Sequence, residues 1–251
     1  MSIIQGTAKP TSGDASFYPF EIGQSLRFDG SSYLSRTPAS PDSLRWTVSL
    51  WLKRSALGST QDIFSGYDGT GNDDSTGGYT FLRFESNDKI NFSARNKSIF
   101  TTTAVYRDTS AFYHIVLVFN SSSSSALLYV NSVLQATTSP STSYIDSTNS
   151  WNSGATSGIT NQIGSWNSSN KLKGYIAEFN NIDGYKTGST LATYDDFGEF
   201  KNGVWVPKEY KTSGSSNQYG TNGFRLNFSD ATSTTTLGYD SSGNSNHWTL
   251  N

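Results

Sequence analysis

The chain has 251 residues, no cysteine and a formal net charge of −2, with 18 Lys and Arg against 20 Asp and Glu. The lack of cysteine excludes a disulfide framework, a cysteine-ligated zinc site and a thiol nucleophile. The basic residues are scattered and form no stripe, so nucleic acid is not an expected partner. The first 20 residues show no secretory signal, and no apolar run approaches the ~20 residues of a membrane span, so no membrane is expected either.

Segments in which apolar and polar residues alternate recur along the chain, and a period of two predicts β-strands. Strands are expected, in chain order, at 25–30, 33–36, 46–54, 62–66, 79–84, 89–94, 98–106, 112–119, 126–131, 133–138, 161–166, 174–182 and 223–229. Clusters of Gly, Ser, Asn and Asp separate them and favour turns. Helical periodicity is nearly absent, and its best candidate, 190–200, predicts a turn or two. The pattern indicates a β-sandwich or barrel.

Five consecutive serines, Ser121 to Ser125, stand between the apolar runs 114–119 and 127–130. They could form a linker between two domains or the tip of a hairpin. Each run is too short and apolar to stand alone, and a polar connection of five to seven residues is an ordinary hairpin length. We therefore expect a hairpin tip.

The two ends of the chain carry similar patterns, with Leu26 and Phe28 near the start and Leu226 and Phe228 near the end. We expect these four side chains to point inward and the two strands to pair, closing one domain over residues 21–251. Residues 1–20 are expected to form an extended, polar N-terminal arm. Its aromatic residues, Phe17, Tyr18 and Phe20, are the candidate assembly anchor.

Several segments together resemble a known family. The series "SLRFDG", "WTVSLWLKR", "FYHIVLVFN", "LLYVNS" and "GYIAEFNNIDG" resembles the concanavalin A-like lectin/glucanase superfamily in its laminin-G-like form. More narrowly, "SYLSRTPAS" (32–40), "YRDTSAFYH" (106–114), "FGEFKNGVWVPKEY" (197–210), "YGTNGFRLNFSD" (219–230) and "GNSNHW" (243–248) are similar to domains of tail-fibre and other virion proteins of marine bacteriophages, particularly cyanophages.

The resemblance implies an all-β, concanavalin A-like jelly-roll sandwich preceded by the N-terminal arm. It also implies a non-enzymatic structural protein located in the virion, made in the host cytoplasm, that decorates the capsid or forms part of a head or tail appendage. The expected partners are other virion proteins and further copies of the same chain. The alternative is a receptor-binding, lectin-like tail-fibre module that recognises polysaccharide on the host surface.

Glycoside hydrolysis would need a pair of carboxylates flanking the scissile bond. The chain lacks the Glu-x-Asp-x-Glu triplet of the glucanases, and Glu178 and Asp183 are five residues apart, which predicts opposite faces of a strand. We expect Glu178 to face solvent or to pair with an Arg or Lys. The two histidines, His114 and His247, lack metal-ligand spacing, and His114 is expected to be a hydrogen-bonded structural imidazole.

The densest cluster of side-chain oxygens is the loop 67–78, "YDGTGNDDSTGG", with Asp68, Asn72, Asp73 and Asp74. Calcium is bound by such oxygens, but the spacing does not fit an EF-hand loop. No cofactor is therefore predicted, and calcium remains the alternative at this loop.

Exposed aromatic rings among Ser, Asn and Gly are typical of adaptable binding surfaces. Tyr67, Tyr144, Trp151 and Trp166 have such surroundings, and 141–158 is the most adaptable segment. These four residues are the candidate contacts to a glycan or a partner. The other interpretation is that their rings cover the rim of the sandwich.

Overall fold

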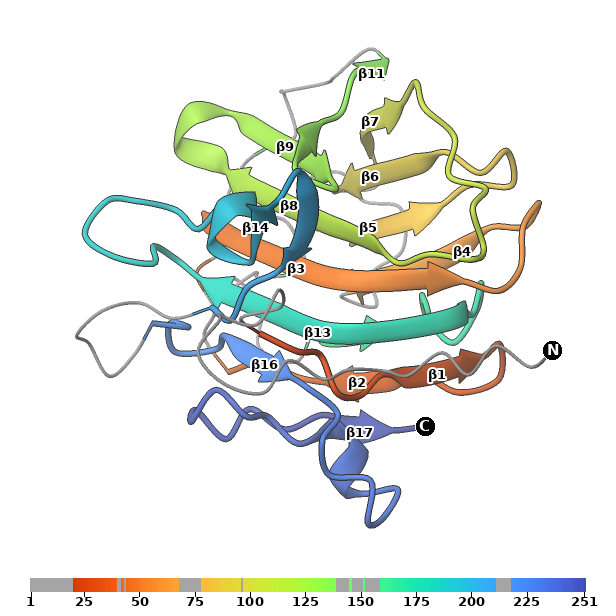
Figure 1. Cartoon of the computed structure of the whole chain (residues 1–251), viewed down its shortest axis with the longest axis vertical. Helices are drawn as coiled ribbons and strands as arrows, with labels where there is room; N and C mark the ends of the chain where they lie inside the picture. Colours follow the sequence, from red (N-terminus) through yellow and green to blue (C-terminus); the bar gives the residue numbers. More distant parts are fainter. Residues whose placement is uncertain are drawn as a thin grey trace, which may run out of the picture.

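The structure, a computed structural model, describes residues 20–39, 42, 44–67, 78–95, 97–138, 145, 151, 159–210 and 218–251. These residues form a sandwich of two antiparallel sheets, as the sequence predicts, with a small third hairpin on one face (Figure 1). Among them, no helix has the length and apolar character that crossing a membrane would require.

The first sheet has the strand order β1-β13-β3-β8-β9-β10, with β16 also paired to β13. Its strands are β1 (Leu26–Asp29), β3 (Arg45–Arg54), β8 (Tyr113–Asn120), β9 (Ser125–Val130), β10 (Val133–Leu134), β13 (Lys173–Asp183) and β16 (Phe224–Leu226).

The second sheet has the order β11-β7-β6-β5-β4-β12-β2-β17. Its strands are β2 (Leu34–Arg36), β4 (Gln61–Tyr67), β5 (Tyr79–Phe84), β6 (Ile90–Ala94), β7 (Lys97–Thr102), β11 (Thr137–Thr138), β12 (Thr160–Ile163) and β17 (Thr249–Leu250). The third hairpin joins β14 (Gly198–Lys201) to β15 (Val204–Pro207), and three single 3-10 turns are η1 (Ser121–Ser123), η2 (Tyr194–Asp196) and η3 (Thr236–Gly238).

The core lies between the two sheets and is built from the alternate residues of each strand. Trp46, Val48, Leu50 and Leu52 of β3 are all fully buried in it, as their alternation predicts. The Trp46 ring stacks on Phe119 of β8 at 5.0 Å between ring centroids. Close-packed rings of this kind contribute stability beyond the area that they bury.

The serine run is the tip of a hairpin, as expected. β8 and β9 pair antiparallel, with Asn120 opposite Ser125, and η1 forms the connection between them. The Asn120 side chain accepts a hydrogen bond from the Ser122 backbone, and Ser124 adopts a left-handed φ of 49°. An Asn cap satisfies an otherwise free backbone N–H, so the Asn120 side chain stabilises this polar loop.

The predicted pairing of the first and last patterned strands is wrong. β1 and β16 each pair with β13, through Leu26 opposite Ile176 and Leu226 opposite Phe179. β13 is 11 residues long, so two short strands lie end to end along it instead of beside each other. Leu26, Phe28, Leu226 and Phe228 nevertheless contribute to the core, as expected.

The outer face of the first sheet is partly covered by residues 185–210. Val116 and Val118 of β8 and Ile182 of β13 point to this face and form a second apolar cluster with Ala192 and Phe197. In Figure 1, β14 and the strand beside it lie in front of β3 and β8. The segment 190–200, for which a turn or two was expected, contains only the 3-10 turn η2 before β14.

Candidate functional site

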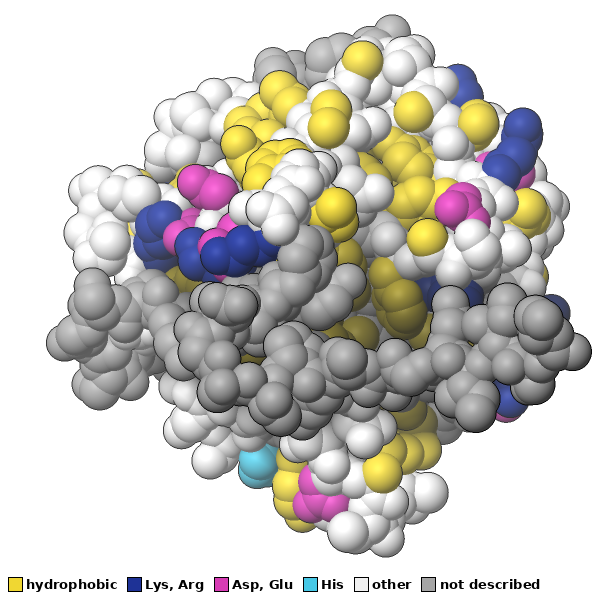
Figure 2. All heavy atoms as spheres, viewed as in Figure 1, with side chains coloured by type: hydrophobic (Ala, Val, Ile, Leu, Met, Phe, Trp, Pro, Cys, Tyr) yellow, Lys and Arg dark blue, Asp and Glu magenta, His cyan; other side chains and the backbone are white. Residues whose placement is uncertain are grey.

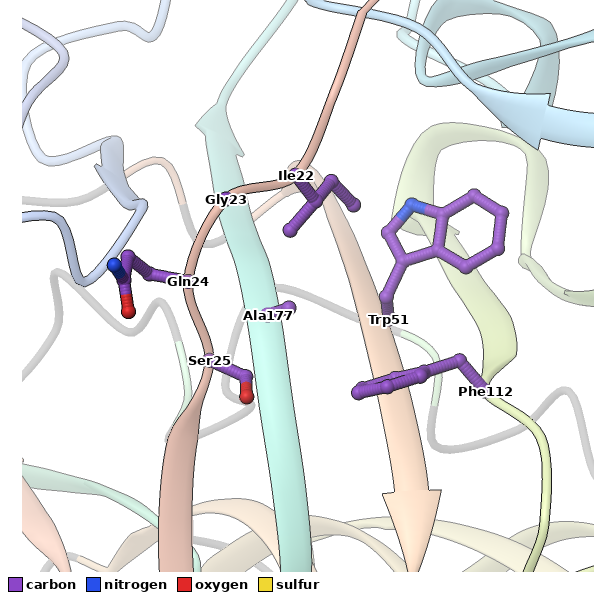
Figure 3. Close-up of a pocket in the computed structure, with 7 residues that line it drawn as sticks. All are labelled: Ile22, Gly23, Gln24, Ser25, Trp51, Phe112 and Ala177. Atoms are coloured by element: carbon purple, nitrogen blue, oxygen red, sulfur yellow. The ribbon is translucent and has the colours of Figure 1, made fainter. Parts of the chain in front are cut away.

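A pocket of about 410 Å³ lies on the part of the outer face that the hairpin leaves open. It is lined by Ile22, Gly23, Gln24, Ser25, Trp51, Phe112 and Ala177. Figure 3 shows the rings of Trp51 and Phe112 on one side, the segment 22–25 on the other, and Ala177 of β13 between them. The same face in Figure 2 shows hydrophobic side chains gathered in its recessed centre. A concave, mostly apolar site with a few polar groups is the usual form of a small-ligand site.

Trp51 reaches this pocket because it alternates with the core residues of β3. Leu50 and Leu52 point into the sandwich, so Trp51 points to the outer face, where it lies opposite Ala177 of β13. Ala177 has a short side chain, which leaves room above the sheet beside the indole. Phe112, immediately before β8, is 37 % exposed and supplies the second ring.

The Trp51 ring stacks on that of its cross-strand neighbour His114 of β8, at 4.7 Å between ring centroids and an interplanar angle of 16°. The buried imidazole accepts a hydrogen bond at Nδ1 from the Trp205 indole, at 3.0 Å. Its Nε2 therefore carries the proton and donates to Ser49 Oγ at 2.9 Å. Burial lowers the pKa of His114 to about 3, so the ring is neutral at physiological pH. His114 is the hydrogen-bonded structural imidazole that the sequence predicts.

Trp205 closes the face on the far side of His114. It lies on β15 and also contacts Tyr194, at 5.8 Å between ring centroids. Gly198, on the facing strand β14, must be glycine for this packing, because an added Cβ would lie 2.2 Å from Trp205 Cζ2. The hairpin thus holds Trp205, Trp205 orients His114, and His114 supports the half-buried Trp51.

The two carboxylates of β13, Glu178 and Asp183, accept hydrogen bonds from other parts of the chain. Glu178, at a β-bulge with a φ of 49°, accepts two hydrogen bonds from Arg225, at 2.9 and 3.2 Å. It therefore pairs with an arginine, as the sequence predicts. Asp183 accepts hydrogen bonds from the backbone N–H groups of Asp42 and Asn222. The seven described residues that line the pocket include no carboxylate.

Trp151 is not an exposed loop residue, and the expectation that its ring is available to a ligand is wrong. Its side chain is 1 % exposed and packs in the core against Phe64 at 4.4 Å and Trp248 at 6.2 Å. The indole N–H donates to Asn181 Oδ1 at 3.3 Å. Polar neighbours in the sequence suggested a surface loop, but the indole is large enough to fill the space between the sheets.

Two of the other candidate aromatics lie together on the second sheet. Trp166 makes edge contacts with Tyr67 at 6.1 Å and with Tyr79 at 5.5 Å, and all three are half-buried. Their role as glycan or partner contacts stays a prediction. The fourth candidate, Tyr144, lies outside the residues that the structure describes.

The predicted N-terminal anchor is described only in part. Phe17 and Tyr18 lie outside the described residues, whereas the half-buried Phe20 ring lies 5.5 Å from the guanidinium carbon of Arg225. The last residue of the expected arm thus contacts the sandwich. Its function as an anchor stays a prediction.

The candidate calcium ligands Asp68, Asn72, Asp73 and Asp74 also lie outside the described residues. Within the described part of the chain, no group of three or more His, Asp or Glu side chains could hold a metal ion.

The sequence did not single out Trp51, Phe112 or the segment 22–25. One signal was present, because the alternation in 46–54 leaves one large aromatic residue, Trp51, on the face opposite the core. The pairing of β1, β13, β3 and β8 brings Phe112 and residues 22–25 close to Trp51. The sequence pattern does not predict this pairing.

The family model of the concanavalin A-like lectin/glucanases superfamily matches residues 28–190, and the chain belongs to this superfamily. No curated protein matches the sequence significantly. Among solved structures, a Bacteroides ovatus protein described as a proposed carbohydrate-binding protein has a TM-score of 0.59 at 13 % identity, over 90 % of this chain and 57 % of that chain. The chain therefore spans little more than half the length of that protein.

Two further solved structures are similar at lower scores. The SAP-like pentraxin of Limulus polyphemus has a TM-score of 0.44 at 17 % identity, covering 69 % of this chain and 80 % of that chain. Domains LG4–5 of the mouse laminin α1 chain have a TM-score of 0.42 at 14 % identity, covering 69 % of this chain and 45 % of that chain.

Proposed function

We propose that the protein is a carbohydrate-binding module that holds a glycan in the pocket formed by Trp51, Phe112 and residues 22–25. The observation that carries the proposal is the Trp51 ring, presented on a rigid stack in a cavity of about 410 Å³. Aromatic rings bind well when their orientation is fixed before the ligand arrives, because little conformational entropy is then lost.

The polar groups of the pocket suit a sugar. Ser25 lines the pocket and offers a hydroxyl group, and the segment 22–25 adds backbone amides at the rim. The description of the Bacteroides ovatus neighbour as a proposed carbohydrate-binding protein supports the same class of ligand. Because the described lining has no carboxylate pair, we propose binding without cleavage.

A glycan array probed with the full chain tests the proposal. Trp51→Ala should weaken the binding of every glycan that the parent protein retains by about tenfold or more, since a central aromatic contact is lost. Phe112→Ala should weaken it less, because that ring lies at the rim. Circular dichroism should show that both variants remain folded.

Trp166→Ala is the matched control, because it removes a half-buried indole from the second sheet and leaves the pocket intact. The proposal fails if no glycan on the array is retained. It fails equally if Trp166→Ala abolishes binding while Trp51→Ala leaves it unchanged, since the site would then be the aromatic group on the second sheet.

The structural role in a bacteriophage particle stays a prediction that rests on the sequence resemblance. Such a role is compatible with glycan binding, since a module on a particle surface can contact host polysaccharide. Quantitative mass spectrometry of purified particles tests it. A fixed copy number of the chain per particle would support the role, and its absence from purified particles would refute it.

A further inference from the structure

A row of two cationic side chains and a tyrosine crosses the outer face of the first sheet, two residues farther along the strands than the pocket. The strand registers place Arg27 of β1 opposite Tyr175 of β13, and Tyr175 opposite Lys53 of β3. Their sequence neighbours Phe28, Ile176 and Leu52 belong to the core, so all three side chains of the row point to the outer face.

The row lies on the same face as the pocket. Trp51 is two residues from Lys53 and Ala177 is two residues from Tyr175, so each pair is separated by about 7 Å along its strand. In the other direction the face is closed, because Ser49 and Thr47 are buried. A ligand that extends beyond Trp51 along the strands therefore passes over the row.

The positive charges of the row are available to a ligand. Arg27 is exposed and Lys53 is half-exposed, and among the described residues neither forms an ion pair within 4.0 Å. A cation that forms no close ion pair at the mouth of a pocket provides charge-assisted hydrogen bonds to an acidic ligand.

The nearest carboxylates have partners of their own. Asp29 accepts hydrogen bonds from the Ser31 hydroxyl and backbone, which lower its pKa to about 2. Asp108 is held in the same way by Ser110, and Lys53 adds a smaller electrostatic effect that also lowers the pKa of Asp108.

Two other charged residues lie near the row or the pocket. Lys173 stands opposite Asp29, one step farther along the strands and away from the pocket. Glu21 lies at the opposite side, beside Phe20 and Pro207. Arg27 and Lys53 are thus the charged groups next to the Trp51 pocket on its open side.

We infer that the module selects an acidic glycan, with a neutral ring against Trp51 and a carboxylate or sulfate group bound between Arg27 and Lys53. This inference rests on the proposed function, because it assigns the chemistry of the same site. Tyr175, in the middle of the row, gives the acidic sugar a ring to lie against. The arrangement favours one negative group next to a stacked sugar and not a uniformly charged polymer, because the pocket itself is lined by uncharged residues.

Matched pairs of glycans test the inference with the full chain. Each pair differs only in the acidic group: sialylated and desialylated oligosaccharides, uronate oligosaccharides and their carboxyl-reduced forms, and sulfated and desulfated oligosaccharides. At low salt, at least one acidic member should bind about tenfold more tightly than its neutral partner, as loss of a charge-assisted contact implies. Raising the ionic strength should reduce that difference.

Variants distinguish the contribution of the two cations to glycan binding from that of the Trp51 pocket. The double variant Arg27→Gln/Lys53→Gln should bind the acidic member no better than the neutral one, while Trp51→Ala should weaken both members. Lys208→Gln, which removes a cation beyond β15, is the control and should leave the preference unchanged.

Two other results would overturn the inference in distinguishable ways. Equal binding of both members of every pair, unaffected by the double variant, would refute the acidic preference and leave the glycan module in place. Binding of no member of any pair, together with an empty glycan array, would refute the proposed function itself.

Discussion

Replacing Trp151 by alanine should destabilise the protein by about 3–5 kcal/mol, the usual cost of removing a large buried ring. The indole is 1 % exposed and contacts Trp46, Phe64 and Trp248, so its loss would leave a cavity between the sheets. For a chain of this size, each kcal/mol lowers the melting temperature by about 2–4 °C, which gives a decrease of about 6–20 °C.

The conservative variant Trp151→Phe separates packing from hydrogen bonding. It keeps a ring in the cavity but leaves Asn181 Oδ1, a buried acceptor, without the indole donor, at a cost of about 1–3 kcal/mol. Urea unfolding followed by circular dichroism gives the free energy of unfolding of each variant. Trp166→Ala should cost less than Trp151→Ala, because its ring is only half-buried.

The assignment of Trp151 to the core would be refuted if Trp151→Ala unfolded within about 1 kcal/mol of the parent protein, as surface substitutions usually do. Such a result combined with loss of glycan binding would restore Trp151 as a ligand contact.

Three further substitutions probe the charges and the hairpin. Burial raises the pKa of Asp62 to about 7. The contribution of this carboxyl group to stability is therefore present below pH 4 and is lost as the pH rises through 7. Asp62→Asn should flatten the pH dependence of the free energy of urea unfolding between pH 4 and pH 7. Arg225→Met leaves Glu178 buried without its guanidinium and should cost about 3–5 kcal/mol, part of which Glu178→Gln in the same chain should restore. Gly198→Ala forces the Trp205 indole to move and should lower the free energy of unfolding by about 1–3 kcal/mol, with a change in indole fluorescence.

Much of the fold could be predicted because it depends on local alternation. The core face of β3 and the serine hairpin tip both follow from patterns within 20 residues. The pairing of the chain ends was mispredicted because strand partnership depends on the length of a third strand, β13, and on its bulge at Glu178. A run of residues such as "IAEFNNID" contains no sign of where an extra residue will be accommodated.

The candidate site could be predicted less well. Sequence reasoning favoured aromatic residues among Ser, Asn and Gly, and this rule selected Trp151, which is buried. It passed over Trp51, which lies in a strand and is half-buried, and whose ring lines the pocket on the outer face. Likewise, Arg27 and Lys53 are 26 positions apart in the sequence, and only the registers with β13 bring them to one row.

The most direct test of the central claim is the NMR spectrum of the indole N–H groups during titration with a glycan retained on the array. The chain has six tryptophans, so each indole gives one signal to assign. We predict that the Trp51 signal shifts most, that Trp205 follows through His114, and that Trp166 does not move. A shift of Trp166 with Trp51 unchanged would contradict the account and place the glycan on the other sheet.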